Sequence, residues 1–229
     1  MTQIYLAKID VALDQKKIDA LIQLISEENQ EKCRRFKKKA DVLRTLYGEL
    51  MVRYFLWKQF SLADEDVEFL KGENGKPYIK GLPVHYSISH AGDFVVCAFC
   101  EKEIGIDIEK IRTIDLKVGK RFFCDSEYED LLMKKKLDQI DYFFTLWTLK
   151  ESYIKWLGTG MLTPLDSFCF SMSQVGISFM DKKREVKPFF KQYFVAGYKL
   201  AVCSVDCDFP DEMENLALEE MIVFKQGLL

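Results

Sequence analysis

The sequence lacks several features that would assign it to a class directly. Its 33 basic and 36 acidic residues give a formal net charge of -3, so the strong basicity typical of nucleic-acid-binding or membrane-surface proteins is missing. No stretch approaches the roughly 18 apolar residues needed to span a membrane. The first ten residues show no secretory leader pattern. We therefore expect a cytoplasmic protein that binds neither nucleic acid nor a membrane.

The pattern of a disulfide framework or of a four-cysteine metal site is also missing. Seven cysteines, an odd number, are scattered among hydrophobic stretches, which is typical of reduced and mostly buried thiols. Cys97 and Cys100 have a spacing that occurs in redox and zinc sites. In a strand, however, they would point to opposite faces, and no second CxxC completes a ligand set. We expect both to be structural thiols.

The residues that are present predict an α+β chain. Hydrophobic residues make up 48% of the sequence, enough for one large core or two small ones. Apolar periodicity predicts both helices and strands. The expected strands are 4–11, 84–90, 94–100, 104–109, 167–172, 176–180 and 192–206, and the expected helical stretches are 14–25, 26–60, 115–123, 125–137 and 141–158.

A weak internal echo suggests that the chain consists of two related halves. The letters RRF at 34–36 recur as KRF at 120–122, and VVCAFCE recurs loosely as LAVCSVD later in the chain. A duplication would give two similar α+β lobes that meet near residues 100–115, with a site in the crevice between them. We assign residues 1–104 to an N-terminal lobe and residues 105–229 to a C-terminal lobe.

The stretch IGIDIE places two acidic side chains together. In a strand, Ile106 and Ile108 point to one face, whereas Asp107 and Glu109 share the other. Two neighbouring carboxylates raise each other's pKa unless a cation lies between them. One interpretation is a solvated strand face. The other is a site for a hard cation such as Mg²⁺, which binds through a few carboxylate oxygens and keeps positions open for phosphates.

A predicted helix later in the chain also carries charged residues that could be either structural or functional. Trp147, Glu151 and Lys155 are four residues apart and therefore lie along one side of the helix, within a strongly apolar segment. The two charged residues could form an ordinary surface ion pair worth about 0.3–0.5 kcal/mol. If they are buried, a functional role is favoured, with Glu151 as a third carboxylate for the metal and Lys155 as a partner for phosphate.

Polar residues elsewhere suit a phosphate-rich small molecule. Ser89 and His90 end a predicted strand and precede the small residues Ala91 and Gly92, which would let a ligand approach the backbone. A purely structural histidine is the alternative. Basic residues recur between Glu31 and Arg44 and in the loop NGKP. Such a run is often only the solvent-exposed face of an amphipathic helix.

These stretches, taken in order, resemble the Sfp-type 4'-phosphopantetheinyl transferases, the larger and two-lobed class of that family. The pattern G-[IV]-D-[IL]-E matches residues 105–109, and [FW]-[STC]-x-K-E-[SA]-x-x-K matches residues 147–155. The resemblance also takes in EKCRRF, NGKP, ISHAG, KRFF and GYKLAVC, so it covers nearly the whole chain. It implies a monomer with two lobes in a pseudo-twofold arrangement, each a small mostly antiparallel sheet packed with helices.

The resemblance also implies a reaction and a set of site residues. The phosphopantetheine arm of coenzyme A would move to a serine of an apo carrier protein and release 3',5'-ADP. Mg²⁺, or Mn²⁺ in its place, would be held by Asp107, Glu109 and Glu151. Residues with implied catalytic roles are Glu127, Glu151 and Lys155. Glu127 stands where the family has a proposed general base, and Glu109 and a metal-bound water are the alternatives for that role. Residues implied to bind coenzyme A are Lys32, Arg44, Gly75, Lys76, Pro77, Ser89, His90 and Lys155.

The implied partners are acyl or peptidyl carrier proteins, or carrier domains, of fatty-acid, polyketide or nonribosomal peptide synthases, as in antibiotic or lipid biosynthesis. Asn29 stands where the family often has a basic residue, which puts one 3'-phosphate contact in doubt. Two other functions fit the same residues. One is a metal-dependent nucleotide phosphohydrolase, and the other is a non-catalytic protein that binds coenzyme A and carriers.

Overall fold

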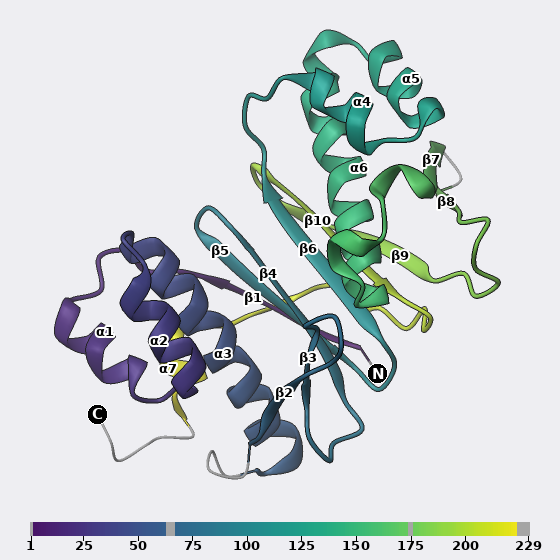
Figure 1. Ribbon diagram of the computed structural model, residues 1–229. Coiled ribbons are helices and arrows are strands. Elements are labelled where there is room, and N and C mark those ends of the chain that lie inside the picture. The colour runs from purple at the N-terminus through teal and green to yellow at the C-terminus, as the bar shows by residue number, and fades with distance from the viewer. Residues whose placement is uncertain (1, 63–66, 174–175, 224–229) are drawn as a thin grey trace.

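The computed structural model describes residues 2–62, 67–173 and 176–223, and these form two lobes that lie side by side (Figure 1). In each lobe a long helix packs against a small sheet. Helix α3 (Lys39–Phe60) serves the first lobe and α6 (Lys136–Leu157) the second, and both have 22 residues. The predicted α+β class is confirmed.

The sheet of the first lobe has the strand order β11-β1-β5-β4. Strands β1 (Gln3–Lys8), β5 (Phe94–Cys100) and β4 (His85–Ala91) pair antiparallel, whereas β11 (Glu214–Asn215) runs parallel to β1. The short hairpin of β2 (Phe69–Lys71) and β3 (Pro77–Ile79) extends from the same lobe. Its other helices are α1 (Gln15–Ile22), α2 (Glu27–Arg35) and α7 (Leu218–Met221).

The sheet of the second lobe has the order β6-β10-β9 and is antiparallel throughout. Its strands are β6 (Ile104–Lys110), β9 (Phe189–Val195) and β10 (Tyr198–Ser204). A separate hairpin pairs β7 (Cys169–Ser173) with β8 (Gly176–Met180). The remaining helices are η2 (Leu116–Val118), α4 (Gly119–Phe122), α5 (Asp125–Met133), η3 (Gly160–Leu162) and η4 (Leu165–Ser167).

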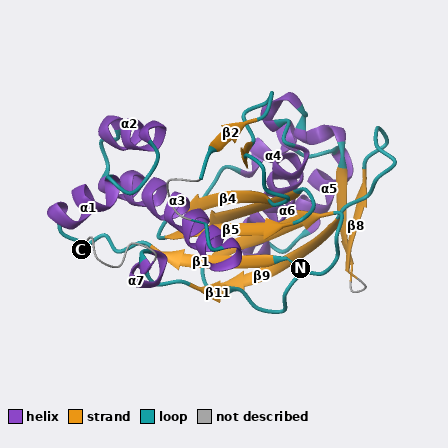
Figure 2. Ribbon diagram, turned by 90° about the horizontal axis from the view of Figure 1, so that it is seen from below, coloured by secondary structure: helices purple, strands orange, loops and turns teal. Residues whose placement is uncertain are grey.

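Three apolar clusters hold the molecule together. One lies under α3 in the first lobe and another under α6 in the second. The third is built from β1 and β5 on one side and from β6, β9 and β10 on the other, so it lies between the two sheets. Seen from below, these strands form one stack flanked by the helices (Figure 2). The lobes are therefore joined by a shared core.

Two serine hydroxyl groups link the sheets where β4 meets β6. The backbone N–H of Ile106 donates to Ser87 Oγ at 3.1 Å, and that of Ile108 donates to Ser89 Oγ at 3.3 Å. Side-chain oxygens thus accept hydrogen bonds that a neighbouring strand's carbonyls would otherwise accept. This junction fixes the height of β6 relative to β4, and with it the position of the acidic residues that β6 carries.

The echo between the two halves of the sequence falls on equivalent elements. The similar stretches VVCAFCE and LAVCSVD lie on β5 and β10. Each of these strands has a partner strand on both sides, β1 and β4 for β5, and β6 and β9 for β10. The division at residue 104 stays a proposal. The last described segment departs from it, because Leu216, Leu218 and Met221 pack into the core of the first lobe and β11 joins its sheet.

The helical run predicted over residues 26–60 is two helices, so that prediction was too long. Phe36 ends α2 in an extended conformation, and Lys38 precedes α3 in another. Five basic residues between positions 34 and 39 repel one another along a continuous helix, which favours a break there. The predicted core positions hold, because Leu43, Leu46 and Leu50 are fully buried and Tyr54 is 8% exposed.

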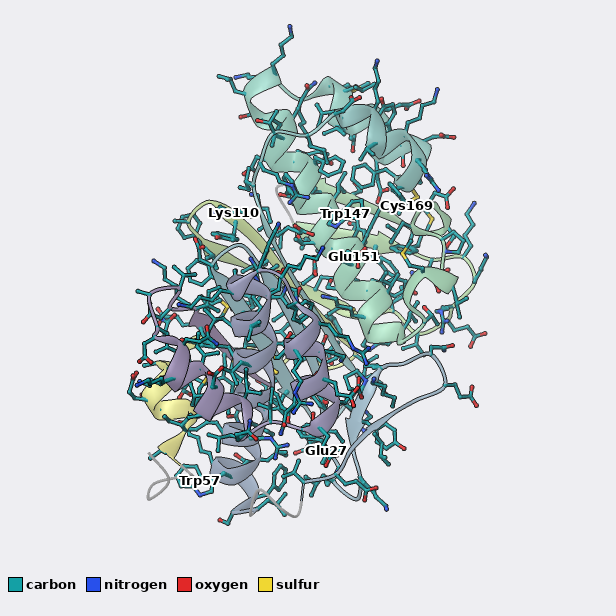
Figure 3. All side chains as sticks on the ribbon, turned by 60° about the vertical axis from the view of Figure 1, so that its left-hand side comes forward. Glu27, Trp57, Lys110, Trp147, Glu151 and Cys169 are labelled. Atoms are coloured by element: carbon teal, nitrogen blue, oxygen red, sulfur yellow. A yellow bond between two sulfur atoms is a disulfide. The ribbon has the colours of Figure 1, made fainter. Side chains whose placement is uncertain are left out.

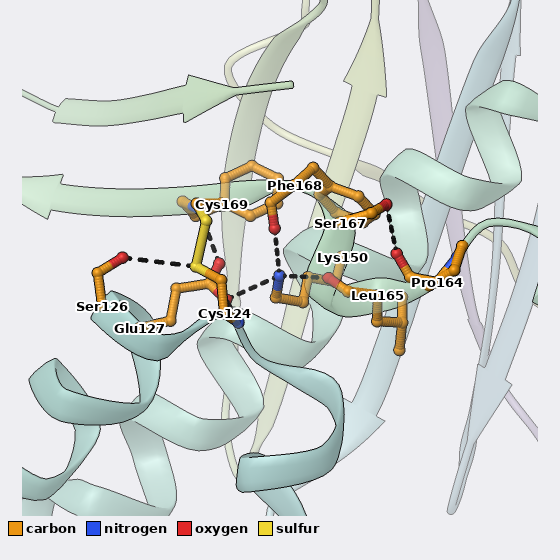
Figure 4. Close-up of a disulfide and its surroundings, with 10 residues drawn as sticks. Cys124, Ser126, Glu127, Lys150, Pro164, Leu165, Ser167, Phe168 and Cys169 are labelled. Carbon is orange, nitrogen blue, oxygen red and sulfur yellow. Dashed lines mark hydrogen bonds and ion pairs between the residues drawn. A yellow bond between two sulfur atoms is a disulfide. The ribbon is translucent and has the colours of Figure 1, made fainter. Parts of the chain in front are cut away.

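The expectation of reduced cysteines is wrong for one pair. Cys124 and Cys169 are joined by a disulfide bond between the start of α5 and the start of β7 (Figure 4). Sequence spacing could not reveal this pair because 45 residues separate its members. Cys97 and Cys100 are free thiols that lie in different apolar clusters, as expected for opposite faces of a strand. Among the described residues, no helix is both long and apolar enough to cross a membrane.

Candidate active site

Two adjoining cavities form the candidate site, one lined by the first lobe alone and the other by residues of both lobes. The first, here called cavity 1, has a volume of about 420 Å³, and the second, cavity 2, has about 360 Å³. Both are lined by Gly75, Pro77, Tyr86 and Ile88, so they form one continuous cleft. The predicted site residues Lys32, Arg44 and His90 line cavity 1. The predicted residues Lys76, Glu151 and Lys155 line cavity 2.

A glycine sets the distance between β6 and α6. A Cβ atom added at Gly105 would lie 2.0 Å from the carbonyl oxygen of Ser152 and 2.4 Å from the backbone nitrogen of Trp156. Any other residue would push the helix away from the strand. Gly105 therefore brings α6, with Glu151 and Lys155, close to the strand that carries Asp107.

Asp107 is buried at the centre of this contact. Its Oδ1 accepts a hydrogen bond from Ser89 Oγ at 2.8 Å and another from Lys155 Nζ at 2.7 Å. Its Oδ2 is also buried but accepts no hydrogen bond from the described residues. The solvated-face interpretation is therefore wrong for Asp107, which is 5% exposed. A buried carboxylate oxygen without a donor is a position where a cation would be stabilised.

Two further carboxylates face the same region. Burial and the negative charge of Asp107 raise the pKa of Glu151 to about 7, although the Lys155 cation lowers it. Burial and Asp107 also raise the pKa of Glu109, which is 3.3 Å from Arg112. Figure 3 shows Glu151 one turn from Trp147 along α6. Neighbouring carboxylates that raise each other's pKa in this way would be stabilised in their ionised forms by a bound cation.

The three carboxylates do not form a finished metal site. Within residues 2–62, 67–173 and 176–223, no group of three His, Cys, Asp or Glu side chains is arranged to hold a metal ion. Lys155 instead neutralises Asp107, and it also donates to the Ile106 carbonyl oxygen at 3.1 Å. The donor set of Asp107, Glu109 and Glu151 has the right chemistry for a hard cation, and the unpaired Asp107 oxygen leaves a position for one.

At the other end of the cleft, basic groups line cavity 1. Arg44 donates to the Gly92 carbonyl oxygen at 3.0 Å and pairs with Asp41. Desolvation, followed by the positive charges of Arg44 and Lys155, lowers the pKa of His90. His90 is consequently poised to gain a proton when an anion enters the cavity.

Two residues predicted to bind coenzyme A are engaged elsewhere. The Ser89 hydroxyl group donates to Asp107 and so orients an acid of the site. Lys76 donates to the carbonyl oxygens of Ile104 at 3.2 Å and Trp156 at 3.0 Å, and it pairs with Glu103. Lys76 therefore ties the loop of the first lobe to the end of α6. The turn at Gly75 and Pro77 still lines both cavities.

The structure does not bring Glu127 to the cleft. This side chain is fully buried beneath α6, where it pairs with Lys150 at 2.7 Å (Figure 4). Its two oxygens also accept the backbone N–H groups of Cys124 and Phe170. A carboxylate with both oxygens occupied and no access to solvent cannot take a proton from an external serine, so the general-base assignment requires correction. Glu127 anchors α6 from the side opposite the cleft.

The structure adds residues to the site that the sequence did not single out. Tyr86 and Ile88 line both cavities, and Lys71 and Glu28 line cavity 1. Met161, which lies in the loop after Gly158 and is predicted from the sequence to contact the carrier, also lines cavity 2. Alternation along β4 could have indicated Tyr86 and Ile88, because they share a face of that strand. No signal in the sequence connects Lys71 with Glu28, which lie 43 positions apart.

Comparison with known proteins identifies the family of the chain. Residues 103–203 match the 4'-phosphopantetheinyl transferase superfamily, and residues 13–102 match the family "4'-phosphopantetheinyl transferase, N-terminal". The chain is 44% identical to the 4'-phosphopantetheinyl transferase Sfp of Bacillus subtilis, over 96% of this chain and 100% of that protein. It is 35% identical to the 4'-phosphopantetheinyl transferase gsp of Aneurinibacillus migulanus, over 90% of this chain and 86% of that one.

One solved structure matches part of the chain. The holo-[acyl-carrier-protein] synthase of Thermotoga maritima is similar over 44% of this chain and 61% of that one, with 20% identity and a TM-score of 0.39. The sequence matches thus extend over both lobes, whereas the structural match covers less than half of the chain.

Proposed function

The chain belongs to the 4'-phosphopantetheinyl transferase superfamily, and from this premise we propose that it moves the 4'-phosphopantetheine arm of coenzyme A to a serine of an apo acyl or peptidyl carrier protein. The observation that carries the proposal is the cleft between the lobes. One end of it has basic residues for phosphate. The other end is lined by Glu151 and Lys155, and Asp107 and Glu109 lie close to Glu151 at a strand–helix contact.

The reaction exchanges one phosphorus–oxygen bond for another. The serine oxygen forms a bond to the phosphorus atom of the pantetheine phosphate, and the bond from that phosphorus to 3',5'-ADP breaks. The serine proton is released, and 3',5'-ADP leaves with the bridging oxygen. Negative charge gathers on the phosphoryl and leaving oxygens during this exchange, so the site must supply positive charge.

Lys155 and a divalent cation are proposed to supply that charge. Asp107, Glu109 and Glu151 would hold Mg²⁺, or Mn²⁺ in its place, and the unpaired Asp107 Oδ2 supports this assignment. When bound, the metal would offset charge on the diphosphate oxygens. Lys155 lies between Asp107 and cavity 2, where its ammonium group can exchange the carboxylate for a phosphate oxygen.

The proton of the carrier serine needs an acceptor within the cleft. We propose Glu109 or Glu151 in place of the buried Glu127, because both carboxylates lie close enough to Asp107 to feel its charge. Without a metal, burial and the charge of Asp107 raise the pKa of both groups, and a divalent cation held by them would lower it again. The proposed reaction takes place in the cytoplasm and on a monomer.

We place the carrier on the second lobe, at the ends of α6, of which the end near Gly158 adjoins cavity 2. Exposed apolar side chains gather at both ends of α6, with Met161 and Leu162 at 79% and 75% exposure near one end and Met133 and Leu137 at 81% and 95% near the other. Lys134, Lys135 and Lys136 lie at the second of these ends. A basic and apolar surface of this kind suits an acidic carrier protein. Carriers of fatty-acid, polyketide and nonribosomal peptide synthases are the proposed partners.

The mass of a carrier protein tests the proposal. The purified chain is incubated with coenzyme A, Mg²⁺ and a panel of apo carriers, and each carrier is then weighed by mass spectrometry. A gain equal to one phosphopantetheine group supports the transferase. Inorganic phosphate without carrier modification would instead identify a nucleotide phosphohydrolase. Unmodified carriers with coenzyme A still bound would identify a binding protein.

A further inference from the structure

A single carboxylate oxygen lies between two lysine side chains at the wall of cavity 1. Lys32 of α2 approaches Glu28 Oε1 at 2.9 Å, and Lys71 of β2 pairs with the same oxygen. All three residues line the cavity. The lysine side chains are 47% and 52% exposed, so an anion from solution can reach both. Two cations from separate elements therefore converge on one point of the cleft.

This convergence requires a negative charge at its centre. Two ammonium groups repel each other at such a separation unless an anion lies between them. Hydrogen bonds from Lys71 and Lys32 lower the pKa of Glu28 to about 2, so the carboxylate is ionised at neutral pH. An exposed ion pair contributes little to stability. A phosphate carries more charge and three acceptor oxygens, so it can replace Glu28 with a net gain in attraction.

The other residues of α2 at this point provide no second cation. Asn29 donates to Glu49 Oε2 at 2.6 Å, and its Oδ1 accepts from Lys32 Nζ at 3.1 Å. Glu49 is 4% exposed and pairs with Arg53 at 2.6 Å. Asn29 is thus an uncharged link that orients Lys32 from a buried ion pair. The second positive charge beside Lys32 comes from the β2–β3 hairpin, through Lys71.

We propose that Lys71 is a phosphate-binding residue, which together with Lys32 takes the 3'-phosphate of coenzyme A in place of the Glu28 carboxylate. The identity of this phosphomonoester rests on the proposed function, whereas the convergence of the lysines does not. Glu28 holds both lysines in position while the cleft is empty and turns to solvent when the phosphate binds. Lys71 therefore helps to distinguish coenzyme A from its analogue without the 3'-phosphate.

Calorimetric titration with coenzyme A and with dephospho-coenzyme A, which lacks only the 3'-phosphate, tests this role in the absence of any carrier. Lys71→Gln is expected to weaken coenzyme A binding about 5- to 20-fold and to leave dephospho-coenzyme A binding unchanged, because one charge-assisted hydrogen bond is lost. Glu28→Gln is expected to strengthen coenzyme A binding, since it removes the competing charge. Lys80→Gln is the matched control. Lys80 lies just beyond β3 and pairs with Glu68 instead.

Equal weakening of both ligands by Lys71→Gln would show that the variant only disturbs the hairpin, and would overturn the proposal. Unchanged binding of both would overturn it as well. The carrier assay and this titration test different claims, so either can give a negative result without the other. If Lys71 binds the 3'-phosphate but no carrier is modified, the role of Lys71 is supported and the proposed transferase activity is contradicted.

Discussion

At the scale of single residues, the site depends on side chains that serve two neighbours at once. Ser89 accepts the Ile108 N–H group and donates to Asp107, so it links the sheets and orients an acid in the same position. Lys155 binds both the Ile106 carbonyl oxygen and the Asp107 carboxylate. These contacts hold Asp107 in place and leave its second oxygen available. Asp107 is therefore oriented before any ligand arrives, although Lys155 occupies its other oxygen.

Replacing Glu151 with Gln separates catalysis from binding. We expect kcat/KM for transfer to fall by about 100-fold or more, because a ligand of the proposed metal is lost. The Kd for coenzyme A is expected to change by less than about threefold, since the basic residues of cavity 1 remain. Transfer kinetics and calorimetry measure the two quantities. Glu101→Gln, at an exposed turn, is the control, and an equal loss of binding and transfer would contradict this division of roles.

Protonation of His90 is expected to accompany binding of coenzyme A. The pKa of His90 is lowered in the free protein, and a phosphate dianion would raise it in the complex. The favourable charge is fully present below the free-state pKa and is lost as the pH rises through the pKa of the complex. Affinity should therefore fall over that interval. Calorimetry in buffers of different ionisation enthalpy measures proton uptake, which His90→Gln should reduce. Equal uptake by the variant would exclude His90.

At the scale of the elements, the contact between β6 and α6 brings the catalytic groups together. The helix carries Glu151 and Lys155, and the strand carries Asp107 and Glu109. Gly105 allows their backbones to touch. On the opposite side of the helix, Lys150 binds Glu127 and the carbonyl oxygens of Leu165 and Phe168, both at 2.8 Å. The helix is thus held between a glycine contact and a buried ion pair.

Gly105→Ala should move α6 and disturb the site. The added methyl group would meet backbone atoms at 2.0 and 2.4 Å, and overpacking of this kind lowers the free energy of unfolding by about 1–3 kcal/mol or more. Transfer should slow because Glu151 and Lys155 move with the helix. Chemical denaturation and transfer kinetics measure the two effects. Gly48→Ala is the stability control, since its nearest contact would be an ordinary 3.4 Å to Ile88. Equal stability of both variants would contradict the argument.

Local patterns predicted those parts of the site that lie within one element. A strand has a period of two, so Ile106 and Ile108 had to share the core face and Asp107 had to oppose them. Burial confirms this, with Ile106 and Ile108 at 0% and 1% exposure. Helical spacing likewise placed Trp147, Glu151 and Lys155 along one side of α6. In these cases the backbone geometry alone determines which side chains are neighbours.

Features that depend on contacts between distant segments could not be read from local patterns. Glu127 lies in a plausible acidic stretch, but its partner Lys150 and the Phe170 N–H group belong to other elements. The bond between Cys124 and Cys169 depends on the same packing. Lys71 of β2 and Glu28 of α2 pair although they lie on elements that are distant in the sequence. Sequence periodicity carries no information about tertiary contacts of this kind.

At the scale of the whole molecule, two similar lobes divide the proposed work. Cavity 1 is lined by the first lobe, and the three carboxylates lie on β6 and α6 of the second. The shared core between the sheets makes the cleft a fixed feature of the fold. The surface proposed for the carrier lies on the second lobe alone. Coenzyme A would therefore bind between the lobes while the carrier approaches from one side.

Two separate variants test the carrier surface, because the ends of the 22-residue helix α6 lie about 33 Å apart. One exchanges Met161 and Leu162 for Ser, and the other reverses the charges of Lys134–Lys136 to Glu. Each should raise the KM for the carrier about tenfold and leave that for coenzyme A unchanged. Lys182→Glu with Lys183→Glu, on an exposed turn elsewhere, is the control. An effect at one end only would confine docking to that end, and no effect at either would refute the surface.

The stoichiometry of the two products tests the central claim most directly. The chain is incubated with coenzyme A, Mg²⁺ and a single apo carrier, and intact carrier mass and released 3',5'-ADP are measured in the same sample. The account predicts one phosphopantetheine group per carrier and an equal amount of 3',5'-ADP, with neither product from a carrier whose acceptor serine is replaced by Ala. Release of 3',5'-ADP without a gain in carrier mass, or an unmodified carrier after prolonged incubation, would contradict it.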